Sequence, residues 1–348
     1  MSRASEQLKI VDFLSIKKFD WGIKSFNIIT GDMGSGKSLC IKLLMFFEDI
    51  IPGLLILPYE QFLANLDYDT FMAKSEKEFR NIFYLGQKGS KGRKIFNIEY
   101  RFSYEEQSVE INIKNDDANN IHIDSSFLRG LLNNWKEHLE AKNHITPDGF
   151  REVKLFFHNE LLKQFGDHFP IATTFIPASR AALAFGSDIS DDYLKNYKNL
   201  VDILPRFQSR NLGSIHSILK AKIKIDKSAL WLESDDGRRV PISKASSGQQ
   251  EIVYVLMLLD RLGNFGYSYG KGQSLFIEEP SAHLFPLEQK QTIELITQVF
   301  NSLKEKDNPV RVFITTHSPY ILNSMNNILK KGILIEKYGR KADEINAA

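Results

Sequence analysis

Short apolar runs along the chain predict the buried strands of an α/β core. Five of them are apolar on both faces and rich in β-branched or aromatic residues: FNIIT (26–30), TTFIP (173–177), SLFIE (274–278), RVFITT (311–316) and GILIE (332–336). Runs without polar alternation are typical of strands that are covered on both faces in a parallel sheet. Patterns of helical period lie between some of these runs, so the sequence predicts strands and helices packed in layers.

A second pattern alternates polar and apolar residues with period two and predicts antiparallel hairpins. It occupies 94–115 and 221–243, and the second segment has the turn sequence DDG at 235–237. Between these hairpins, residues 126–170 have the period of two amphipathic helices that are interrupted near ITPDG, at 145–149. We therefore expect a β lobe and a helical insertion beside the α/β core.

The balanced charge of the chain argues against a dedicated nucleic-acid-binding protein. Its 348 residues include 45 Lys and Arg against 43 Asp and Glu, a formal net charge of +2. Cys40 is the single cysteine, and the first ten residues lack the apolar stretch of a signal peptide. No apolar run reaches the roughly 20 residues that cross a bilayer. These features predict a cytoplasmic protein without a membrane segment.

Residues 31–38 match the phosphate-loop pattern G-x-x-x-x-G-K-[ST] between a predicted strand and a predicted helix. Glycine suits a loop that wraps a phosphate chain with inward N–H groups, in backbone conformations that a Cβ obstructs. Lys37 is expected to reach the β- and γ-phosphates of a nucleotide, and Ser38 to bind Mg²⁺. The predicted nucleotide-binding residues are Gly31, Asp32, Met33, Gly34, Ser35, Gly36, Lys37, Ser38 and Leu39. The alternative is a glycine-rich turn that begins a helix.

Two carboxylates, Glu278 and Glu279, stand where the apolar run at 274–278 ends. Ligands of α/β sheets collect at the carboxyl ends of the strands, so this pair can face the phosphate loop. We expect Glu278 to hold Mg²⁺ through its water shell, and Glu279 to orient or deprotonate an attacking water. The alternative is a strand end with two solvated acids.

His317 directly follows the apolar run at 311–316. At the end of a third parallel strand, the imidazole is placed to donate a hydrogen bond to a γ-phosphate as a neutral group. A structural histidine after a strand is the alternative.

The stretch SSGQQ, at 246–250, precedes a strongly apolar helical pattern. Taken alone it is an ordinary helix start. Ser246 or Ser247 is then the expected N-cap, and Gln250 or Glu251 the expected capping-box partner. The order of the motifs along the chain adds a second interpretation.

That order resembles the order in ABC-class ATPases. GDMGSGKS (31–38) resembles the Walker A loop, LFIEEP (275–280) Walker B, SAHLFP (281–286) the D-loop, and His317 the switch histidine. SSGQQ resembles a divergent ABC signature that consists of Ser246, Ser247, Gly248 and Gln249.

The continuation EEPSAHLFPLEQ, with TTHSPYIL after it, is more similar to one branch of the class than to transporter subunits. This branch contains the overcoming-lysogenization-defect (OLD) nucleases and the related ATPases of bacterial anti-phage systems (the AAA_15 and AAA_21 families). Chromosome-maintenance and break-repair ATPases are its cousins. FIPASRAAL (175–183) resembles a strand-and-arginine segment of the branch. The resemblance covers about residues 7–337.

Three features depart from the family pattern. Glu278 stands where Walker B usually has an aspartate, and Gln249 stands where the signature has its second glycine. Gln61 and Gln87 are the two candidates for the glutamine of the Q-loop. The chain also ends about thirty residues after His317, which leaves no room for the Toprim nuclease domain of the OLD enzymes. Any nuclease is therefore expected to be a separate protein.

The resemblance implies the fold of a P-loop NTPase, an ABC-type ATPase head with an antiparallel β lobe and a helical insertion. One ATPase domain is expected over 1–348. Within it we expect a segment of the β lobe at 94–123, the helical insertion at 126–170, and at 171–337 a second part of the core with the signature, Walker B and the switch histidine.

The resemblance also implies a switch that binds and hydrolyses ATP with Mg²⁺. A signature helix start completes the site of a neighbouring subunit in this class, so the protein is expected to be at least a dimer. The implied catalytic residues are Glu279, His317 and Lys37, and the implied metal ligands are Ser38 and Glu278. The implied role is control of a separate effector, a nuclease or a toxin, in bacterial anti-phage defence.

Two other functions stay open. A repair or chromosome-maintenance ATPase would hold duplex DNA in a positive groove, with phosphate contacts from Lys88, Lys91, Arg93 and Lys94. A solvated turn is the alternative for that basic loop. A transporter's nucleotide-binding subunit fits less well, because such modules are shorter and do not continue as SAHLFP. A small-molecule kinase is excluded mainly by the signature and the histidine, and would return as an option only if SSGQQ were buried in a monomer.

Overall fold

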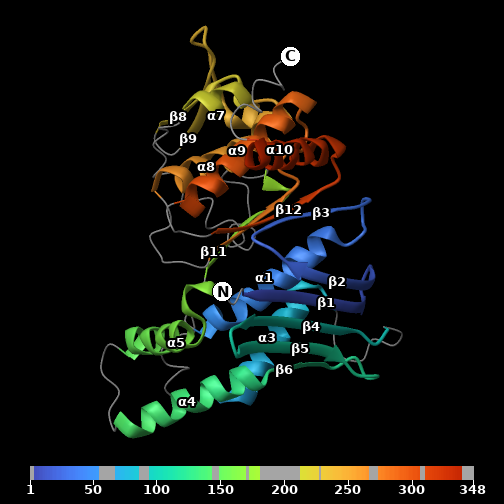
Figure 1. Cartoon of the computed structure of the whole chain (residues 1–348), viewed down its shortest axis with the longest axis vertical. Helices are drawn as coiled ribbons and strands as arrows, with labels where there is room; N and C mark the ends of the chain where they lie inside the picture. The colour runs from blue at the N-terminus through green and yellow to red at the C-terminus, as the bar shows by residue number, and fades with distance from the viewer. Residues whose placement is uncertain are drawn as a thin grey trace. The chain divides into compact units, whose positions relative to one another are not determined.

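The computed structural model describes residues 4–54, 67–85, 94–142, 149–169, 172–180, 212–226, 229–265, 273–305 and 310–338. The chain divides into two compact units (Figure 1). The first contains Met1–Asn27, Gly34–Thr173 and Lys271–Ser274, and the second contains Ile28–Met33, Thr174–Gly270 and Leu275–Ala348.

A five-stranded antiparallel sheet runs through the first unit in the order β2-β1-β4-β5-β6. Its strands are β1 (Ser5–Phe13), β2 (Ile16–Ile23), β4 (Asn97–Tyr104), β5 (Gln107–Asn115) and β6 (Ile121–Asp124). The hairpin predicted at 94–115 is confirmed by β4 and β5, which pair Tyr104 with Gln107. The hairpin of β1 and β2 is absent from the prediction. The sequence does contain the period-two pattern of this hairpin. In the structure Leu8 and Ile10 are fully buried and alternate with less buried neighbours.

The helices of the first unit are α1 (Lys37–Leu54), α3 (Tyr68–Ile82), α4 (Ser126–Lys142) and α5 (Gly149–Phe165), with a short turn η1 (Gly166–His168) after α5. The pair of helices predicted within 126–170 is confirmed by α4 and α5. Most of the predicted interruption lies at 143–148, outside the described residues.

An aromatic cluster joins α1 and α3 to the sheet. Phe79 of α3 is fully buried, and its ring centroid lies 5.7 Å from that of Phe13 and 5.2 Å from that of Phe46. Phe47 of α1 stacks on Tyr100 of β4, with centroids 5.0 Å and planes 8° apart. Such ring pairs add a geometric preference to the burial of apolar area. They hold α1, the helix that follows the phosphate loop, in one orientation against the sheet.

A four-stranded sheet, most of whose residues belong to the second unit, has the order β3-β12-β11-β7. Its strands are β3 (Phe26–Thr30), β7 (Ala172–Ile176), β11 (Gln273–Glu278) and β12 (Val310–Thr316). Four of the five predicted strands are thus confirmed as strands, but β3 is buried only at Asn27 and is partly or fully exposed elsewhere. Every residue of β11 is buried, as expected for a strand that is covered on both faces.

The helices of the second unit are α7 (Leu212–Leu219), α8 (Ser247–Phe265), α9 (Pro286–Glu305) and α10 (Pro319–Tyr338). Together with the sheet they confirm the predicted α/β class (Figure 1). Among the described residues, no helix is long and apolar enough to cross a membrane.

The second unit also carries a small antiparallel sheet, in the order β10-β9-β8. It consists of β8 (Lys222–Asp226), β9 (Ala229–Glu233) and β10 (Arg239–Pro241), followed by the turn η4 (Ile242–Lys244). This sheet confirms the hairpin predicted at 221–243. Gly237, the glycine of DDG, turns the chain with a φ of +82°.

The strand predicted at GILIE, 332–336, is wrong. These residues belong to the last turns of α10, and Ile333 and Leu334 are 62% and 37% exposed. A short apolar run fits either a strand or one stretch of a helix, and period alone does not separate them. Here the helix that begins at Pro319 continues through the run.

Truncation of Phe79, the central ring of the aromatic cluster, tests how much the cluster contributes to stability. Phe79→Ala removes a fully buried ring, so the free energy of unfolding of the first unit should fall by about 3–5 kcal/mol. Urea unfolding followed by circular dichroism measures this change. Tyr84→Ala, at a ring that is 89% exposed, is the control and should stay within about 0.5 kcal/mol of the unsubstituted chain. An equally small effect of Phe79→Ala would contradict a structural role of the cluster.

Candidate functional site

The predicted phosphate loop lies between β3 and α1, as the sequence pattern requires. Gly34 and Gly36 have φ angles of +76° and +96°, which side-chain-bearing residues rarely adopt. A Cβ on Gly36 would also lie 2.7 Å from Cγ1 of Ile16. The amide of Cys40 donates to the carbonyl oxygen of Gly36 at 3.0 Å and begins the hydrogen bonding of α1. The positive end of the helix dipole therefore points toward the loop.

The loop is accessible along most of its length. Asp32, Met33, Gly34, Ser35 and Ser38 are exposed, whereas Gly31, Gly36, Lys37 and Leu39 are partly buried. The segment up to Met33 belongs to the second unit, and the segment from Gly34 belongs to the first.

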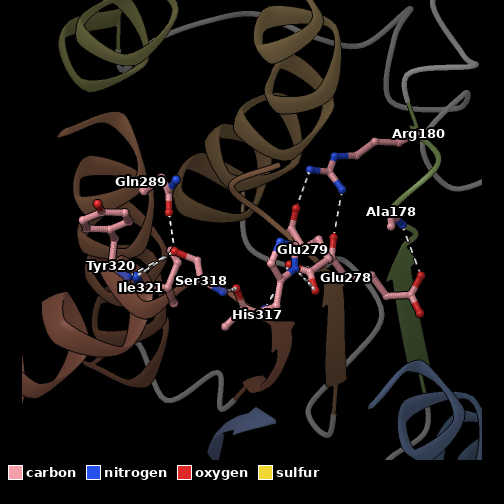
Figure 2. A network of polar contacts seen from close by, with 10 residues as sticks. Ala178, Arg180, Glu278, Glu279, Gln289, His317, Ser318, Tyr320 and Ile321 are labelled. Atoms are coloured by element: carbon pink, nitrogen blue, oxygen red, sulfur yellow. Dashed lines mark hydrogen bonds and ion pairs between the residues drawn. The ribbon is translucent and has the colours of Figure 1, made fainter. Parts of the chain in front are cut away.

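The two predicted carboxylates leave β11 in different environments (Figure 2). Glu278 is 6% exposed, and its Oε2 accepts a hydrogen bond from the amide of Ala178 at 3.2 Å. Its Oε1 is buried and has no hydrogen-bond partner among the described residues. Glu279 turns away with a φ of +44°, and its amide donates to the carbonyl oxygen of Thr315 at 2.9 Å. The carboxyl ends of β7, β11 and β12 therefore meet at one edge.

Glu279 and His317 contact each other at this edge. Oε1 of Glu279 lies 2.9 Å from Nδ1 of His317, and Oε2 accepts a hydrogen bond from the His317 amide at 3.3 Å. The imidazole is 62% exposed and the carboxylate 18%. Because Nδ1 is engaged by the carboxylate, Nε2 is the ring nitrogen that can face a ligand. The carboxylate and the imidazole form an acid–base pair on two neighbouring strands.

Arg180 follows β7, and its buried guanidinium contacts the backbone behind this pair (Figure 2). Nη1 donates to the carbonyl oxygen of Glu278 at 2.8 Å, and Nη2 donates to that of Glu279 at 2.9 Å. Nη1 also donates to the carbonyl oxygen of Pro177 at 3.0 Å, and Nε donates to that of Glu251 at 2.6 Å. Burial raises the pKa of the Glu251 carboxyl, and the charge of Arg180, 3.5 Å away, opposes that rise. The sequence assigned no role to Arg180.

Gln289 of α9 connects the turn after the acids with the residue after the histidine (Figure 2). Its Nε2 donates to the carbonyl oxygen of Leu284 at 2.8 Å, and its Oε1 accepts a hydrogen bond from Oγ of Ser318 at 2.5 Å. Oγ of Ser318 accepts hydrogen bonds from the amides of Tyr320 and Ile321, so Ser318 caps α10. The sequence reasoning missed this link. Serine before the proline that begins a helix is the signal for the cap alone.

The start of α8 is a capping box, but its partner differs from the prediction. The amide of Gln249 donates to Oγ of Ser246 at 3.3 Å, and the amide of Ser246 donates to Oε1 of Gln249 at 3.2 Å. The predicted partners, Gln250 and Glu251, are therefore wrong. With Ser246 as the N-cap, the third helical position falls on Gln249. Gln249 also donates from Nε2 to the carbonyl oxygen of Leu219, at 2.8 Å.

Within the same start, Ser247 is exposed and Gly248 is buried. A Cβ on Gly248 would lie 2.7 Å from the carbonyl oxygen of His283, a residue with a φ of +60°. The helix start therefore packs closely on the turn that follows the acids of its own chain.

The residues present fit a magnesium ion that is completed by a nucleotide. Among the described residues, no group of three or more His, Cys, Asp and Glu side chains could hold a metal. The orphaned Oε1 of Glu278 is a carboxylate oxygen of the kind that Mg²⁺ prefers, and Mg²⁺ commonly takes only one or two protein ligands beside phosphates and water.

Several predicted residues lie outside the described part of the chain. They are Gln61, Gln87, Lys88, Lys91 and Arg93. Of the basic loop, only Lys94 is described, and its Nζ lies 3.6 Å from Oδ1 of Asp12.

One family model matches the chain. It is described as "AAA domain, putative AbiEii toxin, Type IV TA system", and it covers residues 26–323, more than half of the sequence. The comparison with curated proteins finds no match.

The solved structures to which the chain is similar include two SMC heads and a recombination mediator. The SMC head bound to the C-winged helix domain of ScpA is 15% identical, with a TM-score of 0.43 over 92% of this chain and 91% of that chain. The SMC head domain from Thermotoga maritima is 12% identical, with a TM-score of 0.41 over 92% and 91%. RecF, from the RecFOR pathway, is 13% identical, with a TM-score of 0.36 over 91% and 93%. Likenesses of this size decide nothing about function.

The close packing at the start of α8 predicts opposite effects of one substitution in two helices. Gly130 of α4 has nothing within 4 Å of a built Cβ, so Gly130→Ala should stabilise the chain by about 1 kcal/mol. Gly248→Ala should instead destabilise it by about 1–3 kcal/mol, because its methyl group meets the backbone of His283. Thermal unfolding of both variants measures the difference. A Gly248→Ala chain as stable as Gly130→Ala would contradict the contact.

Proposed function

Because the chain belongs to the family described as AAA domain, putative AbiEii toxin, Type IV TA system, we propose that it binds and hydrolyses ATP as an ABC-type switch. The observation that carries the proposal is the sheet edge at which Glu278, Glu279 and His317 lie together. In that sheet β12 lies between β11 and β3, and β3 leads directly into the phosphate loop. Acid, histidine and loop are thus delivered by adjacent strands of one sheet.

In this proposal the loop from Gly31 to Leu39 binds the phosphates of ATP, with Lys37 on the β- and γ-phosphates. Ser38 and Glu278 would hold Mg²⁺, which neutralises phosphate charge when it is bound. Glu279 orients the attacking water and takes its proton, and His317 donates to the γ-phosphate. The contact between Glu279 and His317 fixes the carboxylate and leaves Nε2 to the ligand. Because Nδ1 donates its proton to Glu279, Nε2 can donate to a phosphate only when the ring carries both protons, so the neutral donor that the sequence predicted does not fit this contact.

We further propose that the signature residues complete the site of a neighbouring copy. Ser246 and Ser247 are exposed at the start of a long helix, where backbone amides and the helix dipole favour phosphate. Gly248 supports them by its close contact with the turn at His283. ATP that contacts two copies stabilises the closed oligomer, and hydrolysis removes that contact.

In this proposal the ATPase acts through another protein. We propose that the oligomer controls a separate effector, a nuclease or a toxin, in cytoplasmic anti-phage defence. The family description, which names a putative toxin and a type IV TA system, supports a role in a toxin–antitoxin system.

Substitution of Glu279 tests the proposed chemistry. Glu279→Gln keeps the size of the side chain but cannot take a proton, so turnover should fall by about 10²–10⁴-fold while ATP binding and the ATP-dependent oligomer persist. Lys37→Ala should lose ATP binding. Phosphate release and light scattering after size exclusion, both with ATP and Mg²⁺, measure the two effects. Glu294→Gln, on the surface of α9, is the control. A Glu279→Gln chain that stays monomeric at saturating ATP would contradict the switch.

DNA binding is the alternative function. The dependence of DNA affinity on salt concentration distinguishes it from the ATP-dependent switch. Lys94 already has an ionic partner in Asp12, so we expect only weak, non-specific binding of a DNA duplex. Fluorescence anisotropy at several salt concentrations measures it. A steep fall of affinity with salt that disappears when the basic residues at 88–94 are replaced would favour the DNA-binding function.

A further inference from the structure

We propose that Arg180 is a positioning residue for the acid pair, and that its guanidinium couples this pair to the start of α8. The inference rests on the proposed function, because it concerns the same carboxylates. It goes further in assigning the positioning of Glu279 to Arg180, a residue that donates hydrogen bonds to the backbone carbonyl oxygens of both acids. All the residues involved belong to the second unit.

The cost of burying Arg180 indicates a geometric role. Its side chain is fully buried, and a buried charge is unfavourable unless its donors are paired. Here four hydrogen bonds of 2.6–3.0 Å end on backbone carbonyl oxygens, and the carboxylate of Glu251 lies 3.5 Å from Nε. Apolar side chains often replace buried ion pairs without loss of stability. What an apolar side chain cannot supply is a planar fork that fixes several carbonyl groups at once.

The guanidinium of Arg180 holds the backbone of Glu279. Glu279 has a φ of +44°, a left-handed conformation that is unfavourable for a residue with a Cβ. Its carbonyl oxygen accepts from Nη2 of Arg180 at 2.9 Å and from the amide of Ala282 at 3.2 Å, and its amide donates to Thr315. Both peptide groups of Glu279 are therefore held. Its side chain leaves the backbone in the direction of His317.

The same guanidinium reaches α8. Nε donates to the carbonyl oxygen of Glu251 at 2.6 Å and lies 3.5 Å from its carboxylate. Glu251 lies one helical turn after Ser247, the exposed residue of the signature. A displacement of the start of α8, such as a neighbour's nucleotide would cause, therefore acts on the group that holds Glu279. Arg180 makes the acid pair sensitive to the state of the signature.

Arg180→Lys tests the inference, because it keeps the charge and removes the fork. We expect the kcat of ATP hydrolysis to fall by at least about tenfold, with the Kd of ATP within about threefold of the unsubstituted chain. Hydrogen–deuterium exchange should become about tenfold faster at the amides of Glu279 and Ala282. Arg80→Lys is the matched control, because Nη2 of Arg80 also donates to a backbone carbonyl, that of Asn119, at 2.7 Å in the first unit. It should leave kcat and this exchange unchanged.

Unchanged exchange at Glu279 and Ala282 would overturn the inference. The inference would also be overturned if Arg180→Lys weakened ATP binding as much as it lowered kcat. An equal loss of kcat in the Arg80→Lys control would overturn it as well. If Arg180→Lys fails to fold, Glu251→Gln replaces it, since this variant removes the carboxylate beside Arg180 and should change kcat and exchange in the same directions. An unsubstituted chain without turnover contradicts the proposed function instead. The exchange measurement then still decides whether Arg180 holds the turn.

Discussion

A hydrogen bond from the amide of Glu279 to the carbonyl oxygen of Thr315 ties the end of β11 to the end of β12. The polar contacts of the candidate site depend on this tie. It ends the acidic strand in register with the histidine strand, so the carboxylate of Glu279 meets both the ring and the amide of His317. The turn that follows then packs against Gly248 of α8. Strand ends, turn and helix start are thus parts of one arrangement.

Two features of this arrangement explain departures from the family pattern that the sequence resembles. Gln249 occupies the place of the second signature glycine and completes the capping box with Ser246, so a side chain there stabilises the helix start. Glu278 occupies the place of the usual aspartate. One of its oxygens is engaged by the amide of Ala178, and the other is buried without a partner among the described residues. The longer side chain therefore still offers one oxygen to a cation.

The sequence predicted what depends on local pattern and chain order. Short apolar runs predicted β3, β7, β11 and β12, and the glycine spacing predicted the loop between β3 and α1. The positions of Glu279 and His317 after strand ends followed from the apolar runs before them, but their contact with each other was not predicted. The site assignments themselves stay predictions until a ligand is bound.

What the sequence could not predict depends on contacts between distant residues. The carbonyl groups that Arg180 holds on Glu251, Glu278 and Glu279 lie 71 to 99 residues further along the chain, and backbone acceptors have no sequence pattern. The link through Gln289 is hidden in the same way. The strand predicted at 332–336 was wrong for a different reason. A short apolar stretch has too few residues to distinguish the period of a strand from that of a helix.

Sedimentation equilibrium of the unsubstituted chain with a non-hydrolysable ATP analogue and Mg²⁺ tests the account most directly. A nucleotide held between the phosphate loop of one copy and the signature of another predicts an assembly of at least two chains, with one nucleotide bound per chain, that dissociates when the nucleotide is removed. A chain that binds the analogue at saturation and sediments as a monomer would contradict the account.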